Sequence, residues 1–167
     1  MAIVESAEAG LRAAARGATV VQLRAPKLTA RELEREALTL TARCRVQVVI
    51  SSRVDIALAS NAAGVNLPED DISASDARAL GVRWVSRSVH SVEAARSRKS
   101  AGADFLIFGP VWSTTSHPDR QPKGLAALQA LVAESPVPVL AIGGVTKERI
   151  PEVVAVCAGY ASISLFQ

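Results

Sequence analysis

The chain has few cysteines and few aromatic residues, and both shortages exclude classes of protein. Its two cysteines, Cys44 and Cys157, lie far apart with no CxxC spacing and no neighbouring histidine pattern. This arrangement indicates neither a disulfide framework nor a zinc site. Aromatic residues make up 4% of the chain, whereas nucleic-acid-binding surfaces interleave basic side chains with exposed aromatics. We therefore expect no nucleic-acid partner.

Long apolar runs are also missing. The hydrophobic content of 49% is spread over short runs, whereas a membrane-spanning helix needs about 20 consecutive apolar residues. The segment 1–5 lacks the basic-then-apolar pattern of a signal peptide. We expect one cytoplasmic domain over residues 1–167 without a membrane partner. The net charge of +3 comes from scattered arginines, and such mild basicity suits a phosphorylated metabolite.

Short apolar segments alternate with helix-start signals such as Thr29 followed by Glu32. This alternation predicts a parallel sheet with right-handed crossovers. No GxGxxG turn follows the first segment, and this absence disfavours a doubly wound open sheet. Polar residues gather after the strands, which favours an α/β fold of the TIM (β/α)8 type. The seven expected strands are Thr19–Arg24, Val46–Ser51, Gly64–Leu67, Arg83–Ser88, Asp104–Gly109, Val137–Ile142 and Tyr160–Leu165.

The expected barrel is incomplete at both ends. The chain is expected to open with a helix over 6–16 and to end with the strand over 160–165, so the first strand and the last helix would be lacking. Uncovered strand edges invite association. We therefore expect segments 20–24 and 161–166 either to pair with each other or to be covered by a second copy in a homodimer.

Two of the expected strands end in a way typical of phosphate sites. One stops at Gly143 and Gly144, and the next stops near Ile163 and Ser164. Glycine allows backbone N–H groups to approach an anion, and a helix expected from Thr146 adds its positive end. A tight turn is the alternative explanation for paired glycines. On the last two strands of a barrel, the pattern predicts a phosphate cradle.

Seven ordered motifs resemble the superfamily of thiamine phosphate synthases and TenI-like thiazole tautomerases over nearly the whole chain. The motifs lie at 21–24, 50–58, 63–67, 86–91, 102–105, 108–115 and 141–145. The resemblance implies a barrel fold and a role in thiamine biosynthesis, with a phosphorylated thiazole as ligand.

The resemblance also implies roles for individual residues. Gln22 and Ser88 would face a pyrimidine and its pyrophosphate, and Arg24 would contact the pyrophosphate. Thr114 and Ser116 would surround the thiazole phosphate.

The chain departs from the synthase pattern where Mg²⁺ would bind. Ser51 and Ser52 stand where synthases carry Asn-Asp, which removes a carboxylate, while Asp71 matches the other metal-binding aspartate. The serine pair is a candidate substrate contact or, alternatively, the cap of the next helix. Pro26 and His117 replace expected lysines. Mg²⁺ is therefore expected only if synthase activity is retained, and with weakened affinity.

A tautomerase needs no metal, only a phosphate anchor, a cation for the substrate carboxylate and a general base. Arg24 could hold the carboxylate. His117 is the first candidate base and His90 the second, because Pro110 stands where the related tautomerase has a histidine. We therefore favour a TenI-like thiazole tautomerase without cofactor; the alternatives are a thiamine phosphate synthase and a non-catalytic phosphometabolite-binding or regulatory protein.

Overall fold

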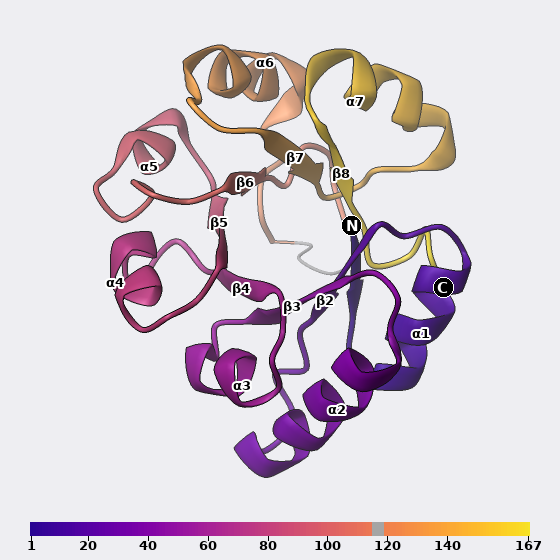
Figure 1. Cartoon of the computed structure of the whole chain (residues 1–167). Helices are drawn as coiled ribbons and strands as arrows, with labels where there is room; N and C mark the ends of the chain where they lie inside the picture. The colour runs from indigo at the N-terminus through magenta and orange to yellow at the C-terminus, as the bar shows by residue number, and fades with distance from the viewer. Residues whose placement is uncertain (115–118) are drawn as a thin grey trace.

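The computed structural model describes residues 1–114 and 119–167. Eight parallel strands form one sheet in sequence order, and in Figure 1 the strands and helices follow one another once around a ring, so that the first and last elements meet. The strands are β1 (Ala2–Val4), β2 (Val20–Leu23), β3 (Gln47–Ser51), β4 (Gly64–Leu67), β5 (Trp84–Val89), β6 (Phe105–Phe108), β7 (Val139–Ile142) and β8 (Gly159–Ala161).

The helices surround the strands as the outer layer of a TIM-type barrel (Figure 1). They are α1 (Ala7–Ala15), α2 (Ala30–Arg43), α3 (Val54–Ala59), α4 (Ala74–Ala79), α5 (Val92–Arg96), α6 (Gly124–Glu134) and α7 (Ile150–Val156), with the 3₁₀ helix η1 (Lys147–Arg149) before the last. The capping box predicted at Thr29 and Glu32 is present at the start of α2. Among the described residues, no helix is both long and apolar enough to span a bilayer.

The expectation that the first strand is missing is wrong. Strand β1 pairs with β2, with Ala2 beside Val21, and on its other side Ile3 N donates to Ser162 O at 3.0 Å. It therefore lies between β2 and the segment after β8 and closes the barrel. The expected direct pairing of 20–24 with 161–166 is likewise wrong, because β1 separates them, and the open edges that a homodimer was expected to cover are absent.

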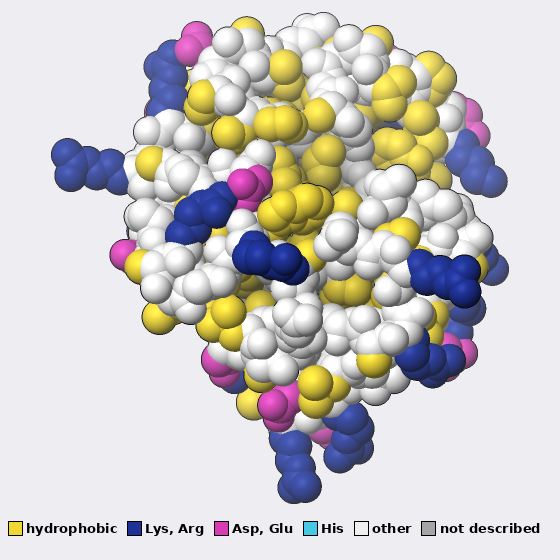
Figure 2. Space-filling view, viewed as in Figure 1, with side chains coloured by type: hydrophobic (Ala, Val, Ile, Leu, Met, Phe, Trp, Pro, Cys, Tyr) yellow, Lys and Arg dark blue, Asp and Glu magenta, His cyan; other side chains and the backbone are white. Residues whose placement is uncertain are grey.

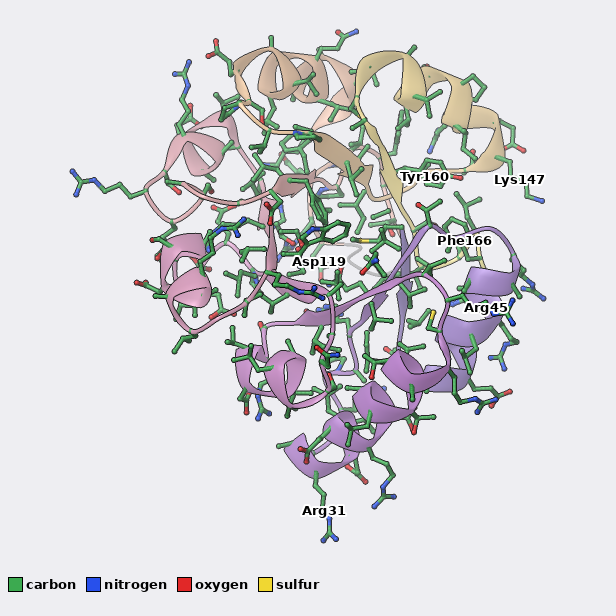
Figure 3. All side chains as sticks on the ribbon, in the orientation of Figure 1. Arg31, Arg45, Asp119, Lys147, Tyr160 and Phe166 are labelled. Atoms are coloured by element: carbon green, nitrogen blue, oxygen red, sulfur yellow. The ribbon has the colours of Figure 1, made fainter. Side chains whose placement is uncertain are left out.

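The end of the chain agrees better with expectation. No helix follows β8 within the described residues, and β8 itself is shorter than the expected strand because the chain turns after Ala161. Phe166 returns to stack on Tyr160, with ring centroids 6.2 Å apart (both labelled in Figure 3). This contact packs the last residues against the barrel.

The core has two parts, as expected of parallel strands buried on both faces. The larger part packs the strands against the surrounding helices, and the smaller joins Met1, Ile3, Ile107 and Ala161. Three of these four, Ile3, Ile107 and Ala161, also line a cavity at the carboxyl ends of the strands. Figure 2 shows hydrophobic side chains at the centre of the viewed face, with most Lys and Arg side chains toward its periphery.

Candidate active site at the carboxyl ends of the strands

A cavity of about 540 Å³ lies at the carboxyl ends of the strands, where (β/α)8 enzymes carry their sites. Ten of the residues singled out from the sequence line it: Gln22, Arg24, Ser51, Ser88, His90, Thr114, Gly143, Gly144, Ile163 and Ser164. Ser52 and Asp71 lie outside its lining. Ser116 and His117 fall outside the described residues. The structure thus brings most of the predicted site together, while the roles of these residues stay predictions.

Gln22 on β2 presents a polar atom without a partner. The residue is 2% exposed, and its Oε1 accepts no hydrogen bond from any described residue. Native proteins rarely leave a buried polar atom unsatisfied, and each such atom requires an explanation. Because Gln22 lines the cavity, a ligand donor is the natural partner. Arg24 lies two residues further along and also lines the cavity, as the period of a strand dictates.

The glycine pair after β7 lies beside the segment after β8, where the sequence predicts a phosphate cradle. Ile142 pairs with Ala161, so the two strand ends are neighbours. Gly143 and Gly144 have φ of 91° and 66°, the region that glycine adopts without strain. Within the described chain, the backbone N–H groups of Gly143, Gly144, Ile163 and Ser164 donate to no protein acceptor. Four N–H groups at one rim of a cavity form a suitable anion site.

An arginine donates a hydrogen bond to the glycine turn of the cradle, and nothing in the sequence indicated this residue. Arg149 of η1 donates from NH1 to Gly144 O at 2.7 Å, and its guanidinium lies 4.8 Å from the ring centroid of Trp112. Side chains larger than glycine would not fit there, because a Cβ at Gly144 would lie 2.6 Å from Ser113 O. Close packing therefore accompanies the turn geometry at this position.

Ser88 belongs to a hydrogen-bonded chain across two strands. Ser86 Oγ donates to Asn66 Oδ1 at 3.0 Å, and Asn66 Nδ2 donates to Ser88 Oγ at 3.1 Å. Since Ser88 Oγ accepts from Asn66, its own proton is left for a ligand acceptor. Asn66 lies within the motif at 63–67 but was given no site role from the sequence, because its bonds to Ser86 and Ser88 depend on the pairing of β4 with β5.

His90 is held between two partners that indicate the tautomer of its ring. Its Nδ1 lies 2.5 Å from Gly109 O, and because a carbonyl oxygen only accepts, Nδ1 carries the proton. Nε2 is then the acceptor for Arg120 NH1 at 2.9 Å. The basic nitrogen is thus occupied in this arrangement. Arg120 also lines the cavity, but a single arginine in a polar loop gave no signal in the sequence.

The carboxylates of Glu69 and Asp71, in the segment 68–72, accept hydrogen bonds from protein donors. Glu69 Oε2 accepts from His90 N at 2.8 Å. Asp71 accepts from Ser52 Oγ at 2.8 Å and from Ile72 N at 2.8 Å, through different oxygens. The helix-cap alternative for the serine pair is wrong, because Arg53 is the N-cap residue of α3 and makes no side-chain cap bond.

This donor set does not fit a Mg²⁺ site. Magnesium is bound by one or two carboxylates together with substrate phosphates and waters, but both carboxylate oxygens of Asp71 already accept hydrogen bonds, from Ser52 Oγ and from Ile72 N. No group of three or more His, Cys, Asp or Glu side chains among residues 1–114 and 119–167 is arranged to hold a metal.

Comparison with known proteins identifies the family. The family model described as thiamine monophosphate synthase matches residues 2–166. The "Putative thiamine-phosphate synthase 2" of Aquifex aeolicus (strain VF5) is 38% identical over 160 residues, covering 90% of this chain and 84% of its own. A "Thiamine-phosphate synthase" of Chloroflexus aurantiacus (strain ATCC 29366 / DSM 635 / J-10-fl) is 37% identical over 157 residues, covering 91% and 70%.

Solved structures agree with this assignment. The thiamine phosphate pyrophosphorylase from Pyrococcus furiosus superposes with a TM-score of 0.88 at 32% identity, covering 98% of this chain and 84% of that one. A 3-hexulose-6-phosphate synthase superposes at 0.71 with 19% identity, covering 96% and 88%, and this likeness shows the fold alone. The resemblance found in the motifs is confirmed, and the chain belongs to the thiamine monophosphate synthase family of enzymes.

Proposed function

We propose that the protein is a thiamine-phosphate synthase, which joins a pyrimidine pyrophosphate to a thiazole phosphate. This replaces the tautomerase favoured from the sequence. The similar proteins carry the synthase name, and Pro110, which stands where the related tautomerase has its basic histidine, lines the cavity without a group that can exchange a proton.

One observation carries the proposal: a single cavity contains two separate sets of recognition groups. The free N–H groups of the cradle suit the phosphate of a thiazole. The unpartnered Oε1 of Gln22 suits an amino group on a pyrimidine. Arg24, beside Gln22, suits the pyrophosphate, because a guanidinium binds phosphate oxygens in a bidentate manner.

These positions suggest how the residues would act. The bond between the pyrimidine methylene carbon and the pyrophosphate oxygen breaks, and its electron pair leaves with the pyrophosphate. Arg24 stabilises the charge that develops on this leaving group. The thiazole nitrogen then donates its lone pair to the methylene carbon. Ile3, Ile107 and Ile142 line the cavity and keep water from the intermediate cation.

The direct test is to incubate the purified protein with both substrates, with and without Mg²⁺, and to follow pyrophosphate and thiamine phosphate. We expect both products in equal amounts, and a loss of at least about tenfold in kcat/KM for Arg24→Ala, because a charge-assisted contact is removed. Arg45→Ala is the matched control, since Arg45 precedes β3 and so lies at the amino ends of the strands, away from the cavity. Absence of both products would overturn the proposal.

A tautomerase remains the second candidate because Arg24 and His90 line the same cavity. Its test is solvent deuterium exchange into the thiazole carboxylate phosphate. Exchange without coupling would establish the tautomerase, whereas binding without exchange or coupling would establish the non-catalytic alternative.

A further inference from the structure

The loop between β4 and α4, residues 68–72, rests on a buried cation. Arg87 of β5 is 0% exposed. Its NH1 donates to Ile72 O at 2.6 Å, and its NH2 donates to Glu69 O at 2.8 Å and to Asp71 O at 3.0 Å. Within the described part of the chain it forms no ion pair. A desolvated charge held by carbonyl oxygens alone is costly, so its position calls for a role.

Nearby charges favour the charged form of this arginine. Burial lowers the pKa of Arg87, while the negative charges of Asp71, Glu69 and Asp70 act in the opposite direction. A guanidinium remains protonated in proteins. The loop 68–72 therefore has a fixed positive charge beneath three acidic residues.

Two further bonds fasten the same loop. Glu69 Oε2 accepts from His90 N, and Asp71 Oδ2 accepts from Ser52 Oγ. The loop is thus tied to β5, to the residue after β5 and to the residue after β3, entirely by protein donors. A divalent cation would bring carboxylates together by taking their oxygens as ligands, but here protein donors already engage both carboxylate oxygens of Asp71 and Oε2 of Glu69.

We infer that Arg87 and the Ser52–Asp71 hydrogen bond hold the loop 68–72 beside the cavity in place of a divalent cation. Arg87 is then a positioning residue, which acts on the site through Glu69 and His90. The inference deepens the proposed function, because it concerns the same cavity. Its principal tests measure metal binding and the protection of loop amides from hydrogen exchange. Neither test needs turnover, so they can fail independently of the proposed reaction.

The first test is titration with Mn²⁺ followed by electron paramagnetic resonance. Wild type, Ser52→Asp and Asp71→Asn are compared. Ser52 has φ of 61°, a conformation in which aspartate is enriched, so Ser52→Asp is compatible with the backbone. We expect no saturable Mn²⁺ binding to wild type and binding at least about tenfold tighter to Ser52→Asp, since a second carboxylate is added.

Two results would overturn the inference. Saturable Mn²⁺ binding to wild type that Asp71→Asn abolishes would show a working metal site. Failure of Ser52→Asp to gain binding would show that the Ser52–Asp71 bond does not occupy a metal position.

The second test is hydrogen exchange at the amides of Ile72 and His90, whose N–H groups bond to the loop carboxylates. We expect Arg87→Met to speed exchange at both amides by roughly tenfold or more, and Ser52→Ala to speed it at Ile72, because local opening becomes easier. Arg78→Met is the matched control. Arg78 also bonds to two carbonyls, those of Gly102 and Arg83, but away from this loop.

If Arg87→Met does not fold, Arg87→Ala with added guanidinium ion takes its place. We expect guanidinium to restore protection at both amides and Mn²⁺ to have no such effect. Where turnover is measurable, Arg87→Lys should raise KM for the pyrimidine substrate more than it lowers kcat. Unchanged exchange at Ile72 and His90 in a folded Arg87 variant would contradict the inference.

Discussion

Arg149 donates a hydrogen bond to the carbonyl oxygen of Gly144 while its guanidinium lies over the ring of Trp112. The carbonyl of Gly144 points to the arginine, and the adjacent N–H groups are left without acceptors in the described part of the chain. The arginine thus fixes the peptide group that joins Gly144 to Val145, directly after the glycine N–H groups that would face an anion.

We predict that Arg149→Met weakens phosphate binding without unfolding the protein. A hydrogen bond from a charged donor contributes about 1.5 to 3 kcal/mol, and even partial loss corresponds to roughly a tenfold rise in the Kd for inorganic phosphate. Isothermal titration calorimetry would measure this change. Arg16→Met, at the C-cap of α1, is the control, and equal affinity of wild type and Arg149→Met would contradict the prediction.

We predict that Gly144, the second glycine of the cradle, tolerates no side chain. Gly144→Ala places a Cβ 2.6 Å from both Ser113 O and the Cβ of Trp112, at a φ of 66°. We expect a loss of unfolding free energy of about 2 to 4 kcal/mol, since strain and steric overlap add, together with loss of phosphate binding. Urea unfolding and phosphate titration measure the two effects.

The matched control separates backbone strain from crowding. Gly17 also has a positive φ, 93°, but nothing lies within 4 Å of the position that a Cβ would take there. Gly17→Ala should therefore lose only about 1 kcal/mol, the backbone part. Equal losses for the two variants would show that crowding at Gly144 is unimportant.

Periodic features of the fold could be predicted from the sequence, whereas contacts between loops could not. Seven strands and the glycine turn after β7 were recognisable because apolar runs and paired glycines are local signals. Strand β1 was missed because its three residues, Ala2–Val4, are too few to show a period. The bond between Ser52 and Asp71 joins two loops, and its existence depends on the barrel that brings β3 and β4 together.

The unpartnered oxygen of Gln22 leads to a prediction in which stability and function change in opposite directions. Gln22→Leu replaces a buried, unsatisfied amide by an apolar group of similar size. We expect it to raise the unfolding free energy by about 1 kcal/mol or more, because the cost of desolvation disappears. It should also raise KM for the pyrimidine substrate, by roughly tenfold if one hydrogen bond is lost.

Thermal unfolding and steady-state kinetics test these two effects of Gln22→Leu. Gln129→Leu, on α6, is the control for replacing glutamine by leucine elsewhere. A loss of stability in Gln22→Leu would indicate that the amide has a protein partner after all.

The capping box of α2 should make a pH-dependent contribution to stability. Glu32 Oε2 accepts hydrogen bonds from Thr29 N at 2.8 Å and from Thr29 Oγ1 at 2.7 Å, and these bonds lower the pKa of Glu32 below its ordinary 4.5. Because the folded pKa lies below the unfolded one, the carboxylate stabilises the fold above the unfolded pKa and loses this effect as pH falls through the folded pKa. Glu32→Ala should therefore differ most from wild type in unfolding free energy above about pH 6, and the difference should shrink below pH 4.5. Urea unfolding across this pH range measures the difference in unfolding free energy between Glu32→Ala and wild type. Glu34→Ala, which removes another carboxylate of α2, is the control. A difference that stays constant with pH would show that the charge of Glu32 does not act through the cap.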